Sequence, residues 1–273
     1  MPELPEVETI CQRLQDLLEG EVIREIRVLD PMCIQGGDAS HVARSLAGSR
    51  VEKIGRRGKY LIFDLEPPAR LIVHLGMTGS IIKDSADTGR HRLTICTEGA
   101  TLAFHDVRRL GRVWICSSSL DDLPPGLRKL GPEPFDRCLD ASRFHRRLNR
   151  TRSSLKAVLL GQRVIAGLGN IYVDEALWES GLHPSRRASS LTEEESAGLL
   201  EAIRRVLILA LEAGGTTFSD YRTPDNTSGS FQRQLKVYGR KGQSCNRCRH
   251  TIERMVVAGR GTHYCPYCQR EQT

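Results

Sequence analysis

The chain has 273 residues, a net charge of +7 and 39% hydrophobic residues. It contains no apolar stretch long enough to cross a bilayer and no apolar segment typical of a secretory signal, which argues against membrane and secreted proteins. We therefore expect a cytoplasmic protein without a membrane partner, large enough to form two or three domains.

Positive charge is concentrated in the second half of the chain. Residues 136–273 contain 22 Lys and Arg against 14 Asp and Glu, whereas residues 1–135 contain 18 against 19. A basic half joined to a near-neutral half favours a polyanionic partner such as a nucleic acid. A basic surface that only serves solubility is the alternative interpretation.

The first eight residues, Met-Pro-Glu-Leu-Pro-Glu-Val-Glu, combine a nucleophile with an acid. Removal of Met1 would leave Pro2 with a free secondary amine, which can attack an electrophilic carbon and form an iminium. An α-amino group has a pKa near ~7.8 against ~10.4 for lysine, so more of it is neutral near pH 7. Glu3 places a carboxyl group beside this amine for general acid–base catalysis. An acidic helix start without chemistry is the alternative.

Apolar residues recur at helical spacing from Val7 to Leu18, and Gly20 ends this predicted helix. Short β-rich runs parted by Gly- or Pro-containing turns follow between residues 21 and 115, and they predict a sandwich or barrel-like sheet. These runs cover residues 22–28, 60–65, 71–75 and 113–115. Gly131-Pro132-Glu133-Pro134 is typical of a linker.

From about residue 140 the apolar period becomes helical. We expect helices over residues 155–160 and 173–180, and a long helix that ends at Gly214. Thr192 and Glu195 have the spacing of a capping box, which predicts the start of this long helix. Residues 216–233 are polar without a period, and they predict a mobile loop between domains.

Four of the nine cysteines form two Cys-x2-Cys pairs separated by sixteen residues. This spacing predicts one tetrahedral Zn²⁺ site, and four sulfur ligands leave no open position, so the metal is expected to be structural. The metal would let the short C-terminal segment fold and present its arginines. The ligands are Cys245, Cys248, Cys265 and Cys268. The other five cysteines are scattered and odd in number, which argues against disulfides, and we interpret them as buried small apolar residues.

Three further positions carry weaker signals. The loop Gly167-Leu168-Gly169-Asn170 could let backbone N–H groups approach a phosphate at a helix start, although an ordinary loop turn explains its glycines equally well. By default Lys59 would be a surface lysine and Met77 a core residue.

Eight motifs along the chain resemble those of the formamidopyrimidine-DNA glycosylase family, in the same order. They are PELPEVE, RRGKY, HLGMTGS, HDVRRLGR, LGPEP, GQRVIAGLGNIYVDEAL, GGTT with VYGRKG, and the four-cysteine pattern. The resemblance implies an α+β multidomain fold: a catalytic helix before an N-terminal β-sandwich (1–130), a helix–two-turn–helix domain (131–235), and a C-terminal four-cysteine zinc finger (236–273). Residues 216–233 match the loop that closes over the extruded base.

The resemblance implies a bifunctional DNA glycosylase and AP lyase of base excision repair. Such an enzyme excises oxidised purines (8-oxoguanine and formamidopyrimidines) from duplex DNA through a Schiff base and nicks the strand by β,δ-elimination. Pro2 would be the nucleophile, Glu3 the acid–base and Glu6 a supporting residue. Lys59 would serve β-elimination, and Arg260 would grip phosphates and take part in δ-elimination.

The resemblance also implies DNA contacts, one structural Zn²⁺ per chain, and a monomer that binds double-stranded DNA with oxidised purines or abasic sites. Met77 and Arg108 match two of three residues that fill the gap left by the flipped base. The third position is normally phenylalanine and is Leu110 in this sequence. The alternative is that Leu110 faces the core and does not fill the gap. The remaining expected contacts are His74, His91, Arg150, Arg152, Lys156, Asn170 and Tyr238.

Two other functions remain open at this stage. The chain could be an endonuclease VIII-like glycosylase that acts on oxidised pyrimidines, although Leu4 and the long 216–233 loop favour the purine branch. It could also be a non-catalytic zinc-ribbon DNA-binding protein, but such a protein has no need of Pro2, Glu3 and Lys59 together.

Overall fold

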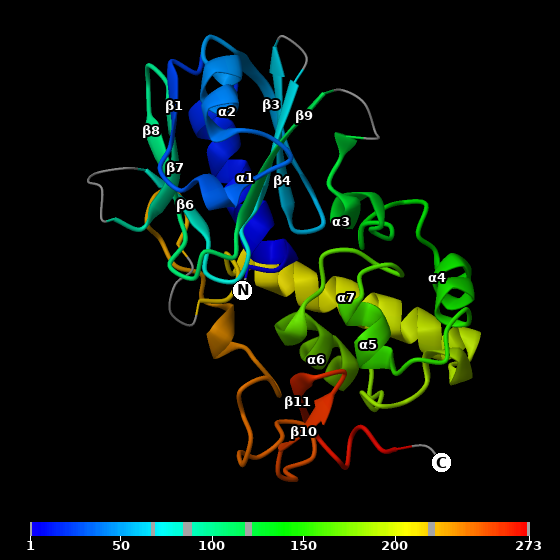
Figure 1. Cartoon of the computed structure of the whole chain (residues 1–273). Helices are drawn as coiled ribbons and strands as arrows, with labels where there is room; N and C mark the ends of the chain where they lie inside the picture. The colour runs from blue at the N-terminus through cyan, green and yellow to red at the C-terminus, as the bar shows by residue number, and fades with distance from the viewer. Residues whose placement is uncertain (1, 67–68, 84–88, 118–121, 218–221, 272–273) are drawn as a thin grey trace. The chain divides into compact units, whose positions relative to one another are not determined.

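The computed structural model describes residues 2–66, 69–83, 89–117, 122–217 and 222–271 (Figure 1). Contacts within the chain divide it into two compact units. The first contains Met1–Arg128 and Ala213–Gln232, and the second contains Lys129–Glu212 and Arg233–Thr273.

The first unit begins with the long helix α1 (Leu4–Leu18). Pro5 occupies its first turn, where a missing N–H costs nothing, and Glu6 adds an acidic side chain near the positive end of the helix dipole. Its apolar residues lie on one buried face, which packs against strand β3 (Arg50–Arg57). The predicted helix and its end before Gly20 are therefore confirmed.

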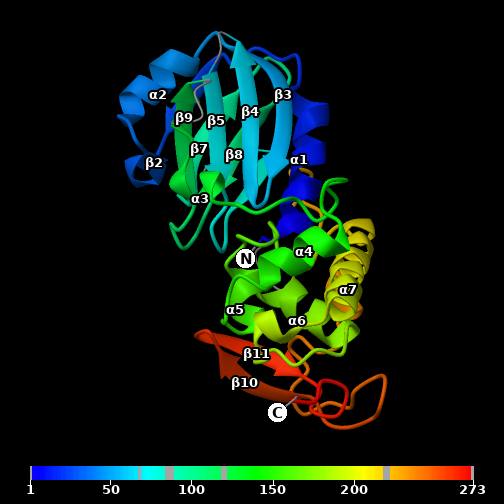
Figure 2. The same ribbon diagram turned by 90° about the vertical axis from the view of Figure 1, so that its right-hand side faces the viewer.

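Two sheets of mostly antiparallel strands follow, and Figure 2 shows the larger one face-on. The five-stranded sheet has the order β2-β9-β5-β4-β3, and the four-stranded sheet has the order β1-β7-β8-β6. The larger sheet adds β2 (Ile34–Gln35), β4 (Tyr60–Glu66), β5 (Ala69–His74) and β9 (Arg112–Ser117). The smaller comprises β1 (Glu25–Val28), β6 (Ser80–Lys83), β7 (His91–Cys96) and β8 (Thr101–His105).

One apolar core joins α1 to both sheets. Alternate residues of β4, namely Leu61, Phe63 and Leu65, point into it, as the period of two requires for a strand with one buried face. Ile10 and Leu14 of α1 belong to the same core. The β-sandwich preceded by a helix is thus confirmed, with the short helices α2 (Ala39–Leu46) and α3 (Pro125–Arg128) and the turn η1 (Pro31–Cys33) as additions.

The second unit is helical around α7 (Glu193–Glu212), against which α4 (Ala141–Leu148) and α6 (Asn170–Glu179) pack. The predicted capping box at the start of α7 is confirmed: Glu195 N–H donates to Thr192 Oγ1 (3.1 Å), and Thr192 N–H donates to Glu195 Oε2 (2.9 Å). Helix α5 (Leu155–Leu160) packs against α6, and a 3-10 turn covers Ala188–Ser190. A further 3-10 turn, Phe231–Arg233, marks the point in the chain where the first unit ends and the second resumes.

A two-stranded hairpin, β10 (Glu253–Val257) and β11 (Arg260–Tyr264), completes this unit. Its two-residue turn consists of Ala258 and Gly259, which have φ angles of +51° and +69°. Positive φ at both turn residues matches the right-handed twist of the strands. Strand β11 packs against α6.

The segment predicted as a loop between domains, 216–233, belongs to the first unit as far as Gln232 and is bonded to the rest of that unit in its described part. Thr216 N–H donates to Glu6 Oε1 (2.6 Å), and Lys83 N–H donates to the Pro224 carbonyl (2.9 Å). Residues 218–221 of this loop lie outside the described residues. The three predicted domain boundaries stay predictions.

In the described part of the chain, the helices are all too short or too polar to cross a membrane.

Candidate active site and metal centre

The N-terminal end of α1 places a carboxyl pair in the protein interior. Pro2 is buried, and Glu3 and Glu6 are each 1% exposed. Glu3 N–H donates to Glu6 Oε2 (2.8 Å), so the backbone at residue 3 is fixed by a side chain one helical turn away. The backbone of Glu3 is therefore held in place at the start of the helix.

Glu6 also holds the start of the 216–233 segment. Its second oxygen, Oε1, accepts the Thr216 N–H at 2.6 Å. Gly215, at φ +85°, makes this approach possible, because a Cβ there would lie 2.8 Å from Glu6 Oε1. One buried carboxylate thus links the first helical turn to a segment more than two hundred residues later in the chain.

Lys59 lies in the turn between β3 and β4 and is 4% exposed, so its default interpretation as a surface lysine was wrong. His74 ends β5 opposite Tyr60 and contacts its ring at a centroid distance of 4.8 Å. Burial of the His74 ring, together with the nearby Lys59 charge, lowers the His74 pKa to about 4. Its Nδ1 accepts the Gly76 N–H (3.2 Å), so Nε2 carries the ring proton in the neutral form.

A second buried carboxylate, Asp106, joins two turns of the first unit. Asp106 is 1% exposed; its Oδ1 accepts the Thr78 hydroxyl (2.5 Å) and the Arg108 N–H (3.2 Å). Its Oδ2 accepts the Gly111 N–H at 2.7 Å. The turn after β5 and the turn after β8 are therefore held together from inside.

The predicted gap-filling residues project from these two turns. Arg108 is exposed, and its Nη1 lies 3.5 Å from Sδ of the half-buried Met77. Leu110 is 41% exposed, so the alternative that it faces the core is wrong. Arg109, between them, has φ +56°, an uncommon conformation that presents its two neighbours on the outside of the turn.

Two predicted DNA contacts are buried. Lys156 is 0% exposed, and its Nζ pairs with Asp174 Oδ1 (2.5 Å) and approaches the Gly261 carbonyl (3.3 Å). His91 is 4% exposed, with its ring 6.0 Å from that of His105. Glu3 and Lys59 are buried to a similar degree, so burial does not decide the role of these two side chains, and both contacts stay predictions.

Asn170 and the hairpin carrying Arg260 form one assembly. Asn170 is the first residue of α6, and its Nδ2 donates to the Gly261 carbonyl (3.0 Å), while its buried Oδ1 has no hydrogen-bond partner. Asp174, one turn later, accepts the His263 N–H (2.8 Å). These bonds fix β11 on α6 and leave Arg260, at the start of β11, exposed.

The predicted contact Tyr238 is positioned by the buried carboxylate of Glu175. Glu175 accepts the backbone N–H groups of Lys236, Val237 and Tyr238 at 2.8–3.0 Å. Burial raises the Glu175 pKa, and the three N–H donors oppose that shift. The half-buried Tyr238 ring meets the His263 ring edge-on at 5.2 Å.

The four predicted metal ligands converge. Their sulfur atoms all lie within 4.8 Å of one another, with Cys245–Cys268 at 3.9 Å and Cys248–Cys265 at 3.4 Å. A tetrahedral zinc site with Zn–S bonds of about 2.3 Å requires sulfur separations of about 3.8 Å. Trp178 Nε1–H points at Cys245 Sγ (3.4 Å), a donor suited to a thiolate ligand. The residues therefore fit a structural metal ion.

Comparisons with known proteins match the chain along its length. The N-terminal domain model of formamidopyrimidine-DNA glycosylase matches residues 1–113, its H2TH domain model matches 130–222, and a zinc finger found in FPG and IleRS matches 242–270. A formamidopyrimidine-DNA glycosylase of Thermus thermophilus is 46% identical over 275 residues, 99% of each chain. That of Exiguobacterium sp. is 41% identical over 99% of this chain and 100% of its own.

The chain belongs to the formamidopyrimidine-DNA glycosylase family.

Solved structures of the family have the same fold. The crystal structure of the Thermus thermophilus MutM (Fpg) protein gives a TM-score of 0.91 at 44% identity and covers 100% of both chains. The Lactococcus lactis Fpg in complex with an abasic-site DNA gives 0.90 at 35% identity, covering 98% of this chain and 100% of its own. The predicted family, fold class and DNA-repair enzyme class are thereby confirmed.

Sequence reasoning missed the internal acids of this family member. Asp106, Asp174 and Glu175 hold the segments that carry the predicted contacts, yet none was singled out. A signal was present for the last two, because adjacent acids interrupt an otherwise apolar helical run, Ile171–Trp178. A buried acid in such a run requires partners, but the sequence does not say which.

We expect Asp106→Asn to lower the free energy of unfolding by about 1–3 kcal/mol. The new NH₂ group is a hydrogen-bond donor, and it would face other donors, either Gly111 N–H or the groups of Thr78 and Arg108, so at least one buried hydrogen bond is lost. Urea unfolding measures the change. Asp16→Asn, on the exposed face of α1, is the matched control and should have almost no effect. Equal unfolding midpoints for both variants would show that the two turns do not depend on Asp106.

The His74 pKa predicts a pH dependence. Between about pH 6.5 and about pH 4 the unfolded chain binds a proton at His74 that the folded chain does not, so stability falls as the pH drops through this window. His74→Gln should flatten this part of the stability profile in urea unfolding from pH 7.5 to pH 4.5. A profile that His74→Gln does not alter contradicts the prediction.

Proposed function

We propose that this chain is a bifunctional glycosylase and AP lyase that removes 8-oxoguanine and formamidopyrimidines from duplex DNA and then nicks the strand by β,δ-elimination. The observation that carries the proposal is the interior position of Pro2, Glu3 and Lys59 in one unit. A DNA-binding protein without catalysis gains nothing from burying an amine, a carboxyl group and a lysine. Family membership supports the same reaction.

The first steps concern Pro2 and Glu3. Once Met1 is removed, the neutral Pro2 nitrogen forms a bond to C1′ of the damaged nucleotide, while the bond from C1′ to the base breaks and the base leaves with the electron pair. The base then takes up the proton that the Pro2 nitrogen loses after its attack. Glu3 delivers a proton to the sugar ring oxygen, the ring opens, and the adduct becomes an iminium. The positive end of the α1 dipole disfavours a protonated amine and so supports attack.

The following steps break the strand. The iminium acidifies the C2′ hydrogen; its removal expels the 3′ phosphate in β-elimination, and a second elimination expels the 5′ phosphate. Lys59 serves the first elimination, and the exposed Arg260 grips phosphates and assists the second. Glu6 supports the site by holding the backbone of Glu3. Water then releases Pro2 from the sugar fragment.

A base inside the duplex cannot reach Pro2, so the nucleotide has to leave the stack. Met77, Arg108 and Leu110 fill the resulting gap, with Asp106 fixing the turns that carry them. His74, Asn170, Tyr238, Arg150 and Arg152 contact the DNA. The described end of the 216–233 loop, tethered to Glu6, is suited to closing over the base. The Lys156–Asp174 pair fixes the hairpin of Arg260.

We also propose that the metal is one structural Zn²⁺, that the chain acts as a monomer, and that it works in the cytoplasm. Four sulfur ligands suit zinc, and the bacterial origin of the curated relatives supports the location.

An oligonucleotide with one 8-oxoguanine opposite cytosine tests the function. We expect strand cleavage, and borohydride should trap a covalent protein–DNA adduct that mass spectrometry places on Pro2. Parallel substrates with an oxidised pyrimidine distinguish the endonuclease VIII-like activity. An adduct on Lys59, or full lyase activity in a form that retains Met1, would rule out the Pro2 mechanism.

Cys248→Ser should release the metal and unfold the hairpin, because a short segment of this kind depends on metal binding for its folding. Lesion-duplex affinity should fall, and the slope of log K against log salt should become shallower by about 0.9 for each phosphate that the protein no longer binds. Metal analysis and salt titrations measure both. Cys138→Ser, an exposed unpaired thiol, is the control; a metal-free Cys248→Ser protein with wild-type affinity would refute the role.

Leu110→Phe tests the gap-filling turn. An aromatic ring can stack on a neighbouring base, which contributes on the order of 1–3 kcal/mol, whereas leucine only excludes water. We expect lesion-duplex binding to tighten by at most that amount, with little change in single-turnover excision, and Leu110→Ala to weaken both. Because Leu110 is 41% exposed, thermal stability should stay unchanged. Unchanged affinity for both variants would remove Leu110 from the interface.

A further inference from the structure

A groove in the second unit is lined by arginines. It has a volume of about 450 Å³ and lies between α5 and the residues that follow α4, with Arg147, Arg150, Arg163, Thr151, Val158 and Val164 on its walls. A smaller hollow of about 260 Å³ adjoins it, lined by Arg143, Arg146, Arg147 and Arg150. We call the two together the arginine groove.

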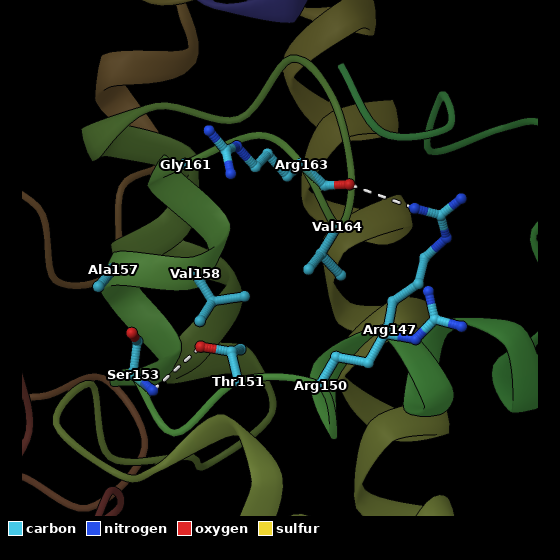
Figure 3. A pocket seen from close by; sticks show the side chains of 9 residues that line it. All are labelled: Arg147, Arg150, Thr151, Ser153, Ala157, Val158, Gly161, Arg163 and Val164. Atoms are coloured by element: carbon cyan, nitrogen blue, oxygen red, sulfur yellow. Dashed lines mark hydrogen bonds between the residues drawn. The ribbon is translucent and has the colours of Figure 1, made fainter. Parts of the chain in front are cut away.

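The guanidinium groups stand around the groove from two sides. Figure 3 shows Arg147 and Arg150 on one side and the Arg163 side chain on the other, with Val158 and Val164 between them. Arg147 Nη1 donates to the Arg163 carbonyl (3.3 Å), which ties the two walls together. The remaining N–H groups of these side chains are directed at solvent, where an anion could bind them.

The charge of this surface is not neutralised within the protein. Residues 141–173 contain six arginines and no Asp or Glu. Among the described residues, none of these six forms an ion pair. Arg143, Arg146 and Arg147 share the exposed face of α4, and Phe144 and Leu148 occupy its buried face. Like charges at this spacing repel one another, and no acidic side chain of the described residues offsets that repulsion. A bound polyanion would reduce the repulsion between the arginines.

The groove and the hairpin of Arg260 lie against different faces of α5. Ser153, Ala157 and Gly161, spaced four residues apart, line the groove along the helix. Lys156, on another face of the helix, reaches the Gly261 carbonyl of the hairpin. The groove is therefore a surface separate from the hairpin.

We propose that the arginine groove binds backbone phosphates of the duplex flanking the lesion, in addition to those held by the hairpin. This inference rests on the proposed function, and it adds Arg143, Arg146, Arg147 and Arg163 to the DNA surface. Arginine and hydroxyl groups are the usual partners of phosphate oxygens, and Thr151 contributes a hydroxyl here. The contacts carry no sequence information, so they serve binding of any duplex.

An acidic peptide is the other polyanion to consider, and the groove suits it less well. A peptide would gain most of its affinity from an apolar side chain buried in the floor. Val158 and Val164, the two apolar residues named on its walls, are already only 9% and 7% exposed. Little apolar area is left to bury, so the binding energy has to come from the guanidinium groups, as it does with phosphates.

The test uses the triple variant Arg143→Gln, Arg146→Gln, Arg163→Gln, which spares Arg150 and Arg152. Its control, with the same loss of charge on exposed arginines of the same unit away from the groove, is Arg137→Gln, Arg187→Gln, Arg205→Gln. Affinity is measured for duplexes that carry a stable abasic-site analogue and are shortened from twelve to two base pairs on one flank or on the other.

We expect shortening of one of the two flanks to lower the affinity of the wild type and of the control variant. The same shortening should leave the affinity of the groove variant unchanged. On the longest duplex the salt slope of the groove variant should be shallower by roughly 0.9 for each phosphate that the variant no longer binds. Nicking of an 8-oxoguanine duplex with the short flank should equal that of the wild type.

Identical flank dependence and salt slopes in the groove variant and the wild type would overturn the proposal. So would binding of a capped peptide of nine glutamates and one phenylalanine by the wild type but not the groove variant, with the DNA data unchanged, because the partner would then be an acidic protein. A wild type that nicks lesion DNA but shows no flank effect refutes the groove alone. A wild type that nicks no lesion substrate refutes the proposed function instead.

Discussion

Buried carboxylates that accept backbone N–H groups are the constraint on which the rest of this structure depends. An ionised carboxylate in the interior is tolerated only when its oxygens are hydrogen-bonded, so each one fixes the segments that supply its donors. Glu6 takes N–H groups from Glu3 and Thr216, and Glu175 takes three from Lys236–Tyr238. Every segment held in this way carries or adjoins a residue proposed to act on DNA.

Hydrogen bonds to buried carboxylates fix turns and loops, which lack regular backbone hydrogen bonds of their own. A turn or loop has no ladder of backbone bonds to hold it, and its exposed side chains contribute little rigidity. Asp106 supplies such bonds to the turn that carries Arg108 and Leu110. Asp174 does the same for the hairpin, where it accepts the His263 N–H and pairs with Lys156. The functional side chains can therefore be exposed while the backbone beneath them stays fixed.

The cysteine cluster and the internal hydrogen bonds have different roles in the C-terminal segment. The hairpin is too small to form a core of its own: its buried cluster consists of Val237, Ile252, two cysteines and Trp178 from α6. Its four clustered sulfur atoms suit a structural metal ion, and Gln269, 0% exposed, bonds Cys265 N–H and the Leu182 carbonyl. The internal hydrogen bonds orient the segment on α6.

The sequence by itself determined the elements that depend on local order. The period of α1, the capping box of α7 and the spacing of the four cysteines are properties of neighbouring residues, and each appears in the structure where it was predicted. The family motifs added the fold and the reaction. These signals do not depend on which distant segments meet.

Tertiary structure alone decided which side chains are inside and what they hold. Lys59 and Lys156 are lysines in polar or helical contexts that any sequence pattern places at the surface, yet they are 4% and 0% exposed. Their burial follows from partners far away in the chain, such as Asp174 and Gly261 for Lys156. The same holds for Leu110, whose exposure depends on Asp106 and on the uncommon backbone at Arg109. A desolvated charge is stable only beside its partner, and local sequence does not specify that partner.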